Sequence, residues 1–81
     1  MVKITPTKLF LKSIKHLDSS QKIKLDKQIQ KIAENPTLGK PMRYERQGTR
    51  EVYLHPFRLS YVYDAEADVV FLLEVYHKKN Q

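Results

Sequence analysis

The sequence predicts an α+β fold: a short N-terminal strand, then an antiparallel pair of helices, then a three-stranded antiparallel meander. Three observations predict it. Apolar residues recur at helical spacing in the first half of the chain, apolar and polar residues alternate between residues 49 and 63, and a nearly apolar run covers residues 69–76. Because 81 residues leave room for one folding unit, we expect a single domain over residues 1–81.

The first two elements are expected to be a strand and a helix. Residues 2–4 alternate as in a short strand, Thr5 is placed to cap a helix, and Pro6 would occupy its first position, where the missing N–H costs nothing. Apolar side chains then follow at i, i+4 and i+7, at Phe10, Ile14 and Leu17. This spacing predicts an amphipathic helix of about three turns.

A second helix follows after a short break. Asp18 interrupts the first pattern and offers a second cap, and Asn35 before Pro36 predicts the end of the helix. Between them the apolar stripe consists of Leu25, Ile29, Ile32 and Ala33. Because only a few residues join the two helices, we expect them to be antiparallel and to cover one common face of the sheet.

Residues 39–48 are predicted to form a loop that leads into the sheet. The segment holds both glycines of the chain, a proline and three basic side chains, Lys40, Arg43 and Arg46. Basic loops at the mouth of a sheet commonly bind phosphate groups, and their glycines are usually just turns. The two interpretations are compatible with each other.

The centre of the sheet is predicted to be a β-hairpin with His55 and Pro56 at its turn. If Leu54 lies opposite Phe57, the remaining pairs follow by counting: Tyr53 with Arg58, Val52 with Leu59, Glu51 with Ser60 and Arg50 with Tyr61. One face then collects apolar and aromatic side chains that we expect to pack under the helices: Val52, Leu54, Phe57, Leu59 and Tyr61.

The other face of the hairpin is predicted to be exposed. It holds Thr49, Glu51, Tyr53, Arg58 and Ser60. One interpretation is an ordinary solvated sheet surface with a cross-strand ion pair between Glu51 and Arg58. The other is a phosphate site, because a guanidinium, a carboxylate, a phenol and a hydroxyl lie side by side there.

The last strand is predicted over residues 69–76. Strict alternation gives an apolar side expected to face the helices, with Val69, Phe71, Leu73 and Val75, and an opposite side with Val70, Leu72, Glu74 and Tyr76. On this count Lys78, and not His77, lies beside Arg58. A bulge or a frayed strand end would instead turn His77 to that side, so both residues stay candidates.

Composition narrows the classes of function. The net charge of +6 and the pI near 9.7 favour a polyanionic partner, nucleic acid or an acidic protein, although lysines also simply solvate helix faces. Residues 1–46 hold eleven basic and four acidic side chains, so the attraction comes from the helical half.

The absence of cysteine excludes disulfides, thiolate metal sites and a cysteine nucleophile. With no apolar run of membrane-spanning length and no signal-peptide core, we expect a cytoplasmic protein without a membrane partner.

These elements and their local strings resemble the RelE/ParE superfamily of bacterial and archaeal toxins. The strings are Gly39-Lys40-Pro41-Met42, Gly48-Thr49-Arg50-Glu51, Phe57-Arg58-Leu59-Ser60-Tyr61 and the terminal His77-Lys78. The resemblance implies the toxin of a type II toxin–antitoxin system, neutralised by an acidic antitoxin. In the RelE branch it implies cleavage of mRNA on the ribosome by attack of a ribose 2′-hydroxyl on the adjacent phosphate, with no metal and no small-molecule cofactor.

The resemblance also implies roles for individual residues. Arg58 would bind the scissile phosphate, His77 or Lys78 would be the general acid, and Glu51 would be the base or would orient Arg58, with His77 as base if Glu51 is not. Tyr53 would stack on a base. The wider set expected to contact RNA is Lys40, Arg43, Arg46, Arg50, Tyr53 and Lys79.

Two other functions stay open. RelE carries lysines at the two positions that match Glu51 and Tyr53, and this chain lacks that pair. Its short tail has no aromatic residue. The ParE branch shares the fold but poisons DNA gyrase without cutting RNA. The other alternative is a basic nucleic-acid-binding module without catalysis, although such modules usually carry more aromatic residues among the basic ones.

Overall fold

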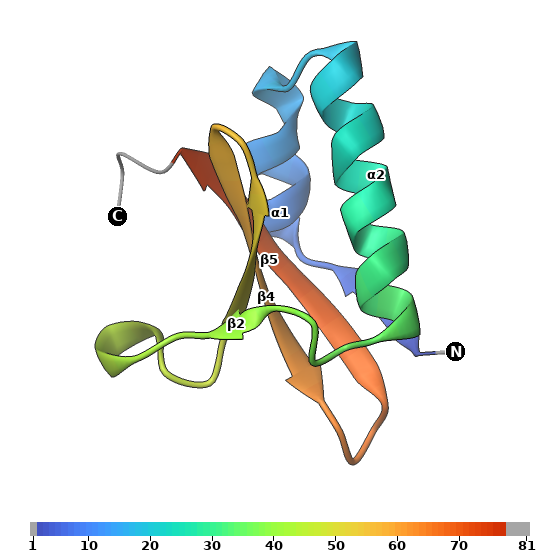
Figure 1. Ribbon diagram of the computed structural model, residues 1–81, viewed down its shortest axis with the longest axis vertical. Coiled ribbons are helices and arrows are strands. Elements are labelled where there is room, and N and C mark those ends of the chain that lie inside the picture. Colours follow the sequence, from blue (N-terminus) through green and yellow to red (C-terminus); the bar gives the residue numbers. More distant parts are fainter. Residues whose placement is uncertain (1, 78–81) are drawn as a thin grey trace.

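The computed structural model describes residues 2–77, which form a five-stranded sheet and two helices (Figure 1). The elements along the chain are β1 (Lys3–Pro6), α1 (Lys8–Ser13), the 3₁₀ turn η1 (Ile14–His16), α2 (Ser19–Glu34), β2 (Lys40–Pro41), the 3₁₀ turn η2 (Tyr44–Arg46), β3 (Arg50–Leu54), β4 (Phe57–Asp64) and β5 (Val69–His77). The predicted α+β class and element order are confirmed. Within residues 2–77 no helix is long and apolar enough to cross a membrane.

The sheet is mixed and has one strand more than the sequence predicts. Its order is β1-β5-β4-β3-β2, with β1 parallel to β5 and the other pairs antiparallel. The additional strand, β2, lies in the segment predicted to be a loop and pairs Lys40 with Glu51. A two-residue edge strand leaves too little alternation in the sequence to be recognised.

The two helices begin at side-chain caps. The prediction of Thr5 as the first cap is wrong, because Pro6 is the last residue of the edge strand β1 and Thr7 caps α1 instead. The hydroxyl of Thr7 accepts the N–H of Phe10 at 3.2 Å and donates to the carbonyl of Leu72 at 2.8 Å, so this cap also ties the helix to β5. The predicted Asp18 cap of α2 is confirmed as a capping box with Gln21.

The predicted hairpin register is confirmed at all five pairs, from Leu54 opposite Phe57 to Arg50 opposite Tyr61. The turn consists of His55 and Pro56, joined by a cis peptide bond. The predicted apolar face is confirmed as well, since Val52, Leu54, Leu59 and Tyr61 are buried in the core and Phe57 packs against it.

A bulge in β5 makes half of the alternation predicted for this strand wrong. Ser60 pairs with Glu74 but Tyr61 pairs with Leu72, so Leu73 is an extra residue without a partner on β4. Before the bulge it is therefore Val70 and Leu72 that lie in the core, while Phe71 is exposed. After the bulge Val75 lies in the core, as predicted.

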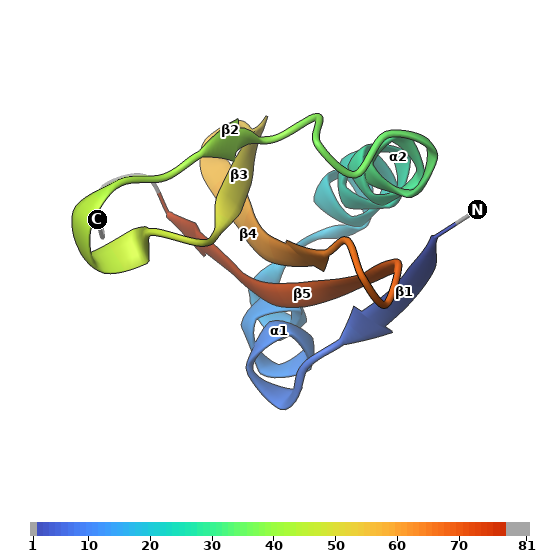
Figure 2. The same ribbon diagram turned by 90° about the horizontal axis from the view of Figure 1, so that it is seen from below.

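Both helices contribute to one core against one face of the sheet. In Figure 1 α1 and α2 run in opposite directions, and α1 packs on β5 while α2 packs near β3. The buried side chains are Phe10 of α1, Leu25 and Ile32 of α2, and Leu17 between the two helices. Figure 2 shows the loop between β2 and β3 extending away from the helices. Within residues 2–77 the opposite face of the sheet, the bare face, carries no helix.

Tyr61 fixes the segment between α2 and β2 onto the sheet. Its fully buried hydroxyl accepts the N–H of Gly39 at 2.7 Å and donates to the carbonyl of Pro36 at 2.8 Å. Burial of the ring raises the pKa of Tyr61. A side chain at position 39 would meet this ring, because a Cβ atom there would lie 2.7 Å from the Tyr61 hydroxyl.

We therefore expect Gly39→Ala to destabilise the fold by about 1–3 kcal/mol through overpacking against a buried ring. Chemical denaturation measures this cost. In a Tyr61→Leu background, where the ring is absent, the same substitution is expected to cost less than about 0.5 kcal/mol. An equal cost in both backgrounds would show that the ring contact does not determine the choice of glycine.

Candidate functional site

The bare face gathers polar side chains from three neighbouring strands. Tyr53 of β3 pairs with Arg58 of β4, and Arg58 pairs with Tyr76 of β5. One step along, Glu51 pairs with Ser60. Because paired residues of a sheet share a face, these five side chains lie together on the side that the helices leave free.

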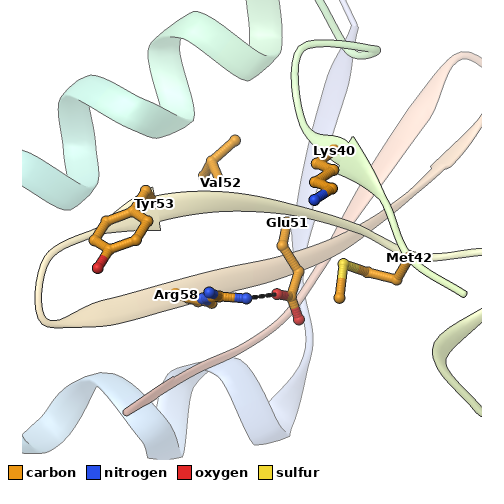
Figure 3. Close-up of a pocket in the computed structure, with 6 residues that line it drawn as sticks. All are labelled: Lys40, Met42, Glu51, Val52, Tyr53 and Arg58. Carbon is orange, nitrogen blue, oxygen red and sulfur yellow. Dashed lines mark hydrogen bonds and ion pairs between the residues drawn. The ribbon is translucent and has the colours of Figure 1, made fainter. Parts of the chain in front are cut away.

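Glu51 lies at the centre of an ionic cluster. Its Oε1 atom lies 3.5 Å from Nη1 of Arg58 (Figure 3). Its Oε2 atom lies 3.4 Å from Nη1 of Arg46 and accepts a hydrogen bond from the hydroxyl of Tyr76. The side chain of Glu51 is only 4% exposed. The predicted ion pair with Arg58 is thus present, but the prediction that Glu51 is exposed is wrong.

The loop between β2 and β3 is what covers Glu51. Its ends are joined by a hydrogen bond from the N–H of Met42 to the carbonyl of Thr49, and the Thr49 hydroxyl donates to the carbonyl of Arg46. Two residues, Tyr44 and Gly48, adopt positive φ angles and let the chain fold back. The guanidinium of Arg46 then lies over the Tyr76 ring, 4.5 Å from its centroid.

Burial makes these partners necessary. An isolated carboxylate removed from water is strongly unfavourable, and only paired charges and hydrogen bonds offset that cost. Two guanidiniums surround one carboxylate here, so the cluster carries a net positive charge. The buried Nε of Arg58 has no hydrogen-bond partner within residues 2–77. A guanidinium beside an open pocket favours the binding of an anion.

A pocket of about 360 Å³ opens beside the cluster. This volume lies in the range of small-molecule sites. Its lining residues are Lys40, Met42, Glu51, Val52, Tyr53 and Arg58 (Figure 3). Two cationic groups, a carboxylate and a half-exposed tyrosine ring therefore converge on one cavity, an arrangement that can hold a phosphate group and a base.

The structure brings several of the predicted site residues together and separates others. Glu51, Arg58, Tyr53 and Lys40 line the pocket, and Arg46 joins through Glu51. Arg43 lies farther along the loop, in a shallow pocket with Tyr44. The predictions for Lys78 and Lys79 lie outside the described residues.

Two predicted residues lie away from the pocket. Arg50 pairs with Tyr61 on the helix side and donates to the carbonyls of Thr37 and Gly39, at 3.2 and 2.8 Å. His77 pairs with Phe57, and their rings meet edge to face with centroids 5.5 Å apart. Because Arg58 pairs with the preceding residue, Tyr76, the structure does not bring His77 and Arg58 onto one face.

Tyr76 is the site residue to which no role could be assigned from the sequence. Alternation alone already placed it on the side opposite the helices. Its hydroxyl donates a hydrogen bond to Glu51, and its ring lies under the guanidinium of Arg46. Among residues 2–77 no three His, Cys, Asp or Glu side chains are grouped as a metal site would require.

A family model described as ParE toxin of type II toxin-antitoxin system, parDE, matches residues 4–81. The chain belongs to this family of toxins, within the RelE/ParE superfamily. No curated protein matches the sequence of the toxin.

Solved structures show the same fold at low identity. The toxin–antitoxin complex RelBE2 from Mycobacterium tuberculosis contains a chain that is 24% identical, with a TM-score of 0.83 and coverage of 95% of this toxin and 98% of that chain. The intact RelBE complex of E. coli gives 22% identity, a TM-score of 0.81 and coverage of 95% and 96%. A YoeB/ParE toxin from Agrobacterium tumefaciens gives 16% identity, a TM-score of 0.79 and coverage of 93% and 96%.

The cluster predicts a difference between two tyrosine substitutions in the toxin. Tyr76→Phe removes a donor from a buried carboxylate, so we expect a loss of about 1–3 kcal/mol in unfolding free energy. Tyr53→Phe, on a ring that is 48% exposed, is the matched control and is expected to change stability by less than about 0.5 kcal/mol. Equal losses in thermal or chemical denaturation would contradict the role given to Tyr76.

Proposed function

We propose that the toxin is a metal-independent endoribonuclease that cuts mRNA on the ribosome and so inhibits translation in the cytoplasm. The observation that supports it is the meeting of Arg58, Glu51, Lys40 and Tyr53 at one pocket on the bare face. In this proposal the scissile phosphate of mRNA lies against Arg58 and Lys40, with a neighbouring base on Tyr53. An acidic antitoxin is the proposed regulator, in keeping with the toxin family and with the net charge of +6.

The proposed reaction needs one proton removed and one donated. Glu51 takes the proton of the ribose 2′-hydroxyl, whose oxygen forms a bond to phosphorus while the bond to the 5′-oxygen breaks. The products are a 2′,3′-cyclic phosphate and a 5′-hydroxyl. Arg58 and Lys40 stabilise the extra negative charge that develops on the phosphate oxygens.

The leaving 5′-oxygen needs a proton donor, and we assign this role to Lys78. The resemblance offers Lys78 and His77 for it, and Lys78 lies outside the described residues. The ring of His77 lies against Phe57, and it is Tyr76, not His77, that pairs with Arg58. The histidine is therefore the weaker candidate for acid or base.

A second function is favoured by a different observation. The carboxylate of Glu51 is buried, and its oxygens are already engaged by Arg46, Arg58 and the hydroxyl of Tyr76, so it is not open to a substrate hydroxyl. Together with the ParE family match, this favours a ParE-like toxin that poisons DNA gyrase through protein contacts.

Primer-extension mapping of mRNA after induction of the toxin tests the nuclease proposal. We expect discrete cuts in translated mRNA with the wild type. Because one aimed donor to a developing anion contributes about 100-fold or more, Arg58→Ala should reduce the cuts by at least about 100-fold. Lys15→Ala, which removes one positive charge from an exposed residue of η1, is the control and should cut normally. Growth arrest with intact mRNA and inhibited gyrase supercoiling would overturn the nuclease in favour of the second function.

The terminal residues are tested in the same assay. We expect His77→Ala to retain cleavage within about threefold of the wild type, since its ring faces Phe57, and Lys78→Ala to reduce it by about 100-fold or more, within the usual range for a general acid. The opposite order of effects would return the acid role to His77.

A further inference from the structure

A second, basic groove lies beside the pocket, between α2 and the turn of the β3–β4 hairpin. Lys24, Lys27 and Lys31 line it from α2, and Tyr53 and His55 line it from the hairpin. The amide of the α2 residue Gln28 donates to the carbonyl of Tyr53 at 2.7 Å, so the helix and the hairpin are fastened to each other where the groove runs. None of the roles described above involves this groove.

We infer that the groove binds the backbone of single-stranded RNA that flanks the phosphate bound at Arg58. The inference rests on the proposed function, because it extends the same RNA strand from the pocket onto α2. It adds a site for several further nucleotides and gives the lysines of this helix a role in binding their phosphates.

Continuity with the pocket is the first argument. Tyr53 lines both cavities, with Arg58 on one side and the α2 lysines on the other. The guanidinium of Arg58 lies 5.8 Å from the centroid of the Tyr53 ring. A single-stranded RNA bound at Arg58 therefore needs only to pass the Tyr53 ring to reach the lysines of α2.

The spacing of the lysines is the second argument. Residues at i, i+3 and i+7 of a helix fall along one side, and Lys24, Lys27 and Lys31 have this spacing. All three are exposed, and among residues 2–77 no carboxylate lines the groove with them. A row of cations along a channel follows the evenly spaced charges of a phosphodiester backbone.

The aromatic pair distinguishes RNA from an acidic peptide as the occupant. The rings of Tyr53 and His55 stack with centroids 5.8 Å apart and planes only 8° from parallel, and Tyr53 is 48% exposed. Flat exposed rings beside a basic channel are typical of single-strand binding, where bases stack on them. An acidic peptide would need the lysines but not the rings.

Fluorescence anisotropy with a labelled twelve-nucleotide 2′-O-methyl RNA tests the inference. The methyl group blocks the attacking hydroxyl, so binding is measured whether or not the toxin cleaves RNA. The groove variant is Lys24→Gln/Lys27→Gln/Lys31→Gln. Its matched control, Lys8→Gln/Lys12→Gln/Lys15→Gln, removes the same charge from exposed residues of α1 and η1. Circular dichroism and thermal melting verify that both variants fold.

We expect the groove variant to bind the RNA at least tenfold more weakly. The slope of log K against log salt should become less steep by about two, since three phosphate contacts are lost. The control variant should stay within threefold of the wild type. Tyr53→Leu should weaken binding about tenfold, whereas Tyr53→Phe, which keeps the flat ring, should not.

Equal losses in the groove and control variants would overturn the inference, because the lysines would then act only through net charge. A groove variant that loses affinity for a decamer of glutamate, but matches the control on RNA, would overturn it in favour of an acidic peptide. Wild-type toxin that binds the RNA through the groove yet leaves mRNA intact in cells would sustain this inference while the nuclease proposal fails.

Discussion

The buried carboxylate of Glu51 is the constraint on which the bare face depends. Removed from water, it requires compensation, and its partners come from three separate parts of the chain: Arg46 from the β2–β3 loop, Arg58 from β4 and Tyr76 from β5. Each partner is thereby fixed in place. The loop is held over the sheet, and the Arg58 guanidinium is held at the pocket wall instead of extending into solvent. A buried ion cluster of this kind contributes little net stability compared with an apolar alternative, so its value lies in where it places the arginine.

The two faces of the sheet have different roles. The helix side contains the core, and its polar groups, such as the Tyr61 hydroxyl and the Arg50 guanidinium, are engaged in holding the backbone near Gly39. The bare side contains the charges that stay available to a ligand. The β3–β4 hairpin connects the two, since Val52 and Leu54 anchor it in the core while Tyr53 between them points toward both the pocket and the α2 groove.

The sequence predicts the features that depend on neighbouring residues and misses those that depend on residues far apart in the chain. The hairpin register was predictable because period-two alternation on both sides of a two-residue turn leaves one consistent pairing. The Leu73 bulge was not, because nothing in the local sequence marks which residue of an apolar strand lacks a partner. The Thr7 cap depends on a carbonyl of β5, 65 positions away. The burial of Glu51 likewise depends on partners from three separate parts of the chain, Arg46, Arg58 and Tyr76, which alternation along one hairpin does not bring into view.

If Arg58, held by Glu51, presents its guanidinium to phosphate on the bare face, nitrogen-15 NMR of the arginine Nε–H groups during titration with a 2′-O-methyl dinucleotide will detect the binding. We expect a saturable shift of the Arg58 signal, because the side chain of Arg58 lines the pocket. The Arg50 signal should stay unchanged, because that side chain is bonded to backbone carbonyls on the helix side. An Arg58 signal that does not move, or one that moves no more than that of Arg50, would show that Arg58 does not bind phosphate there.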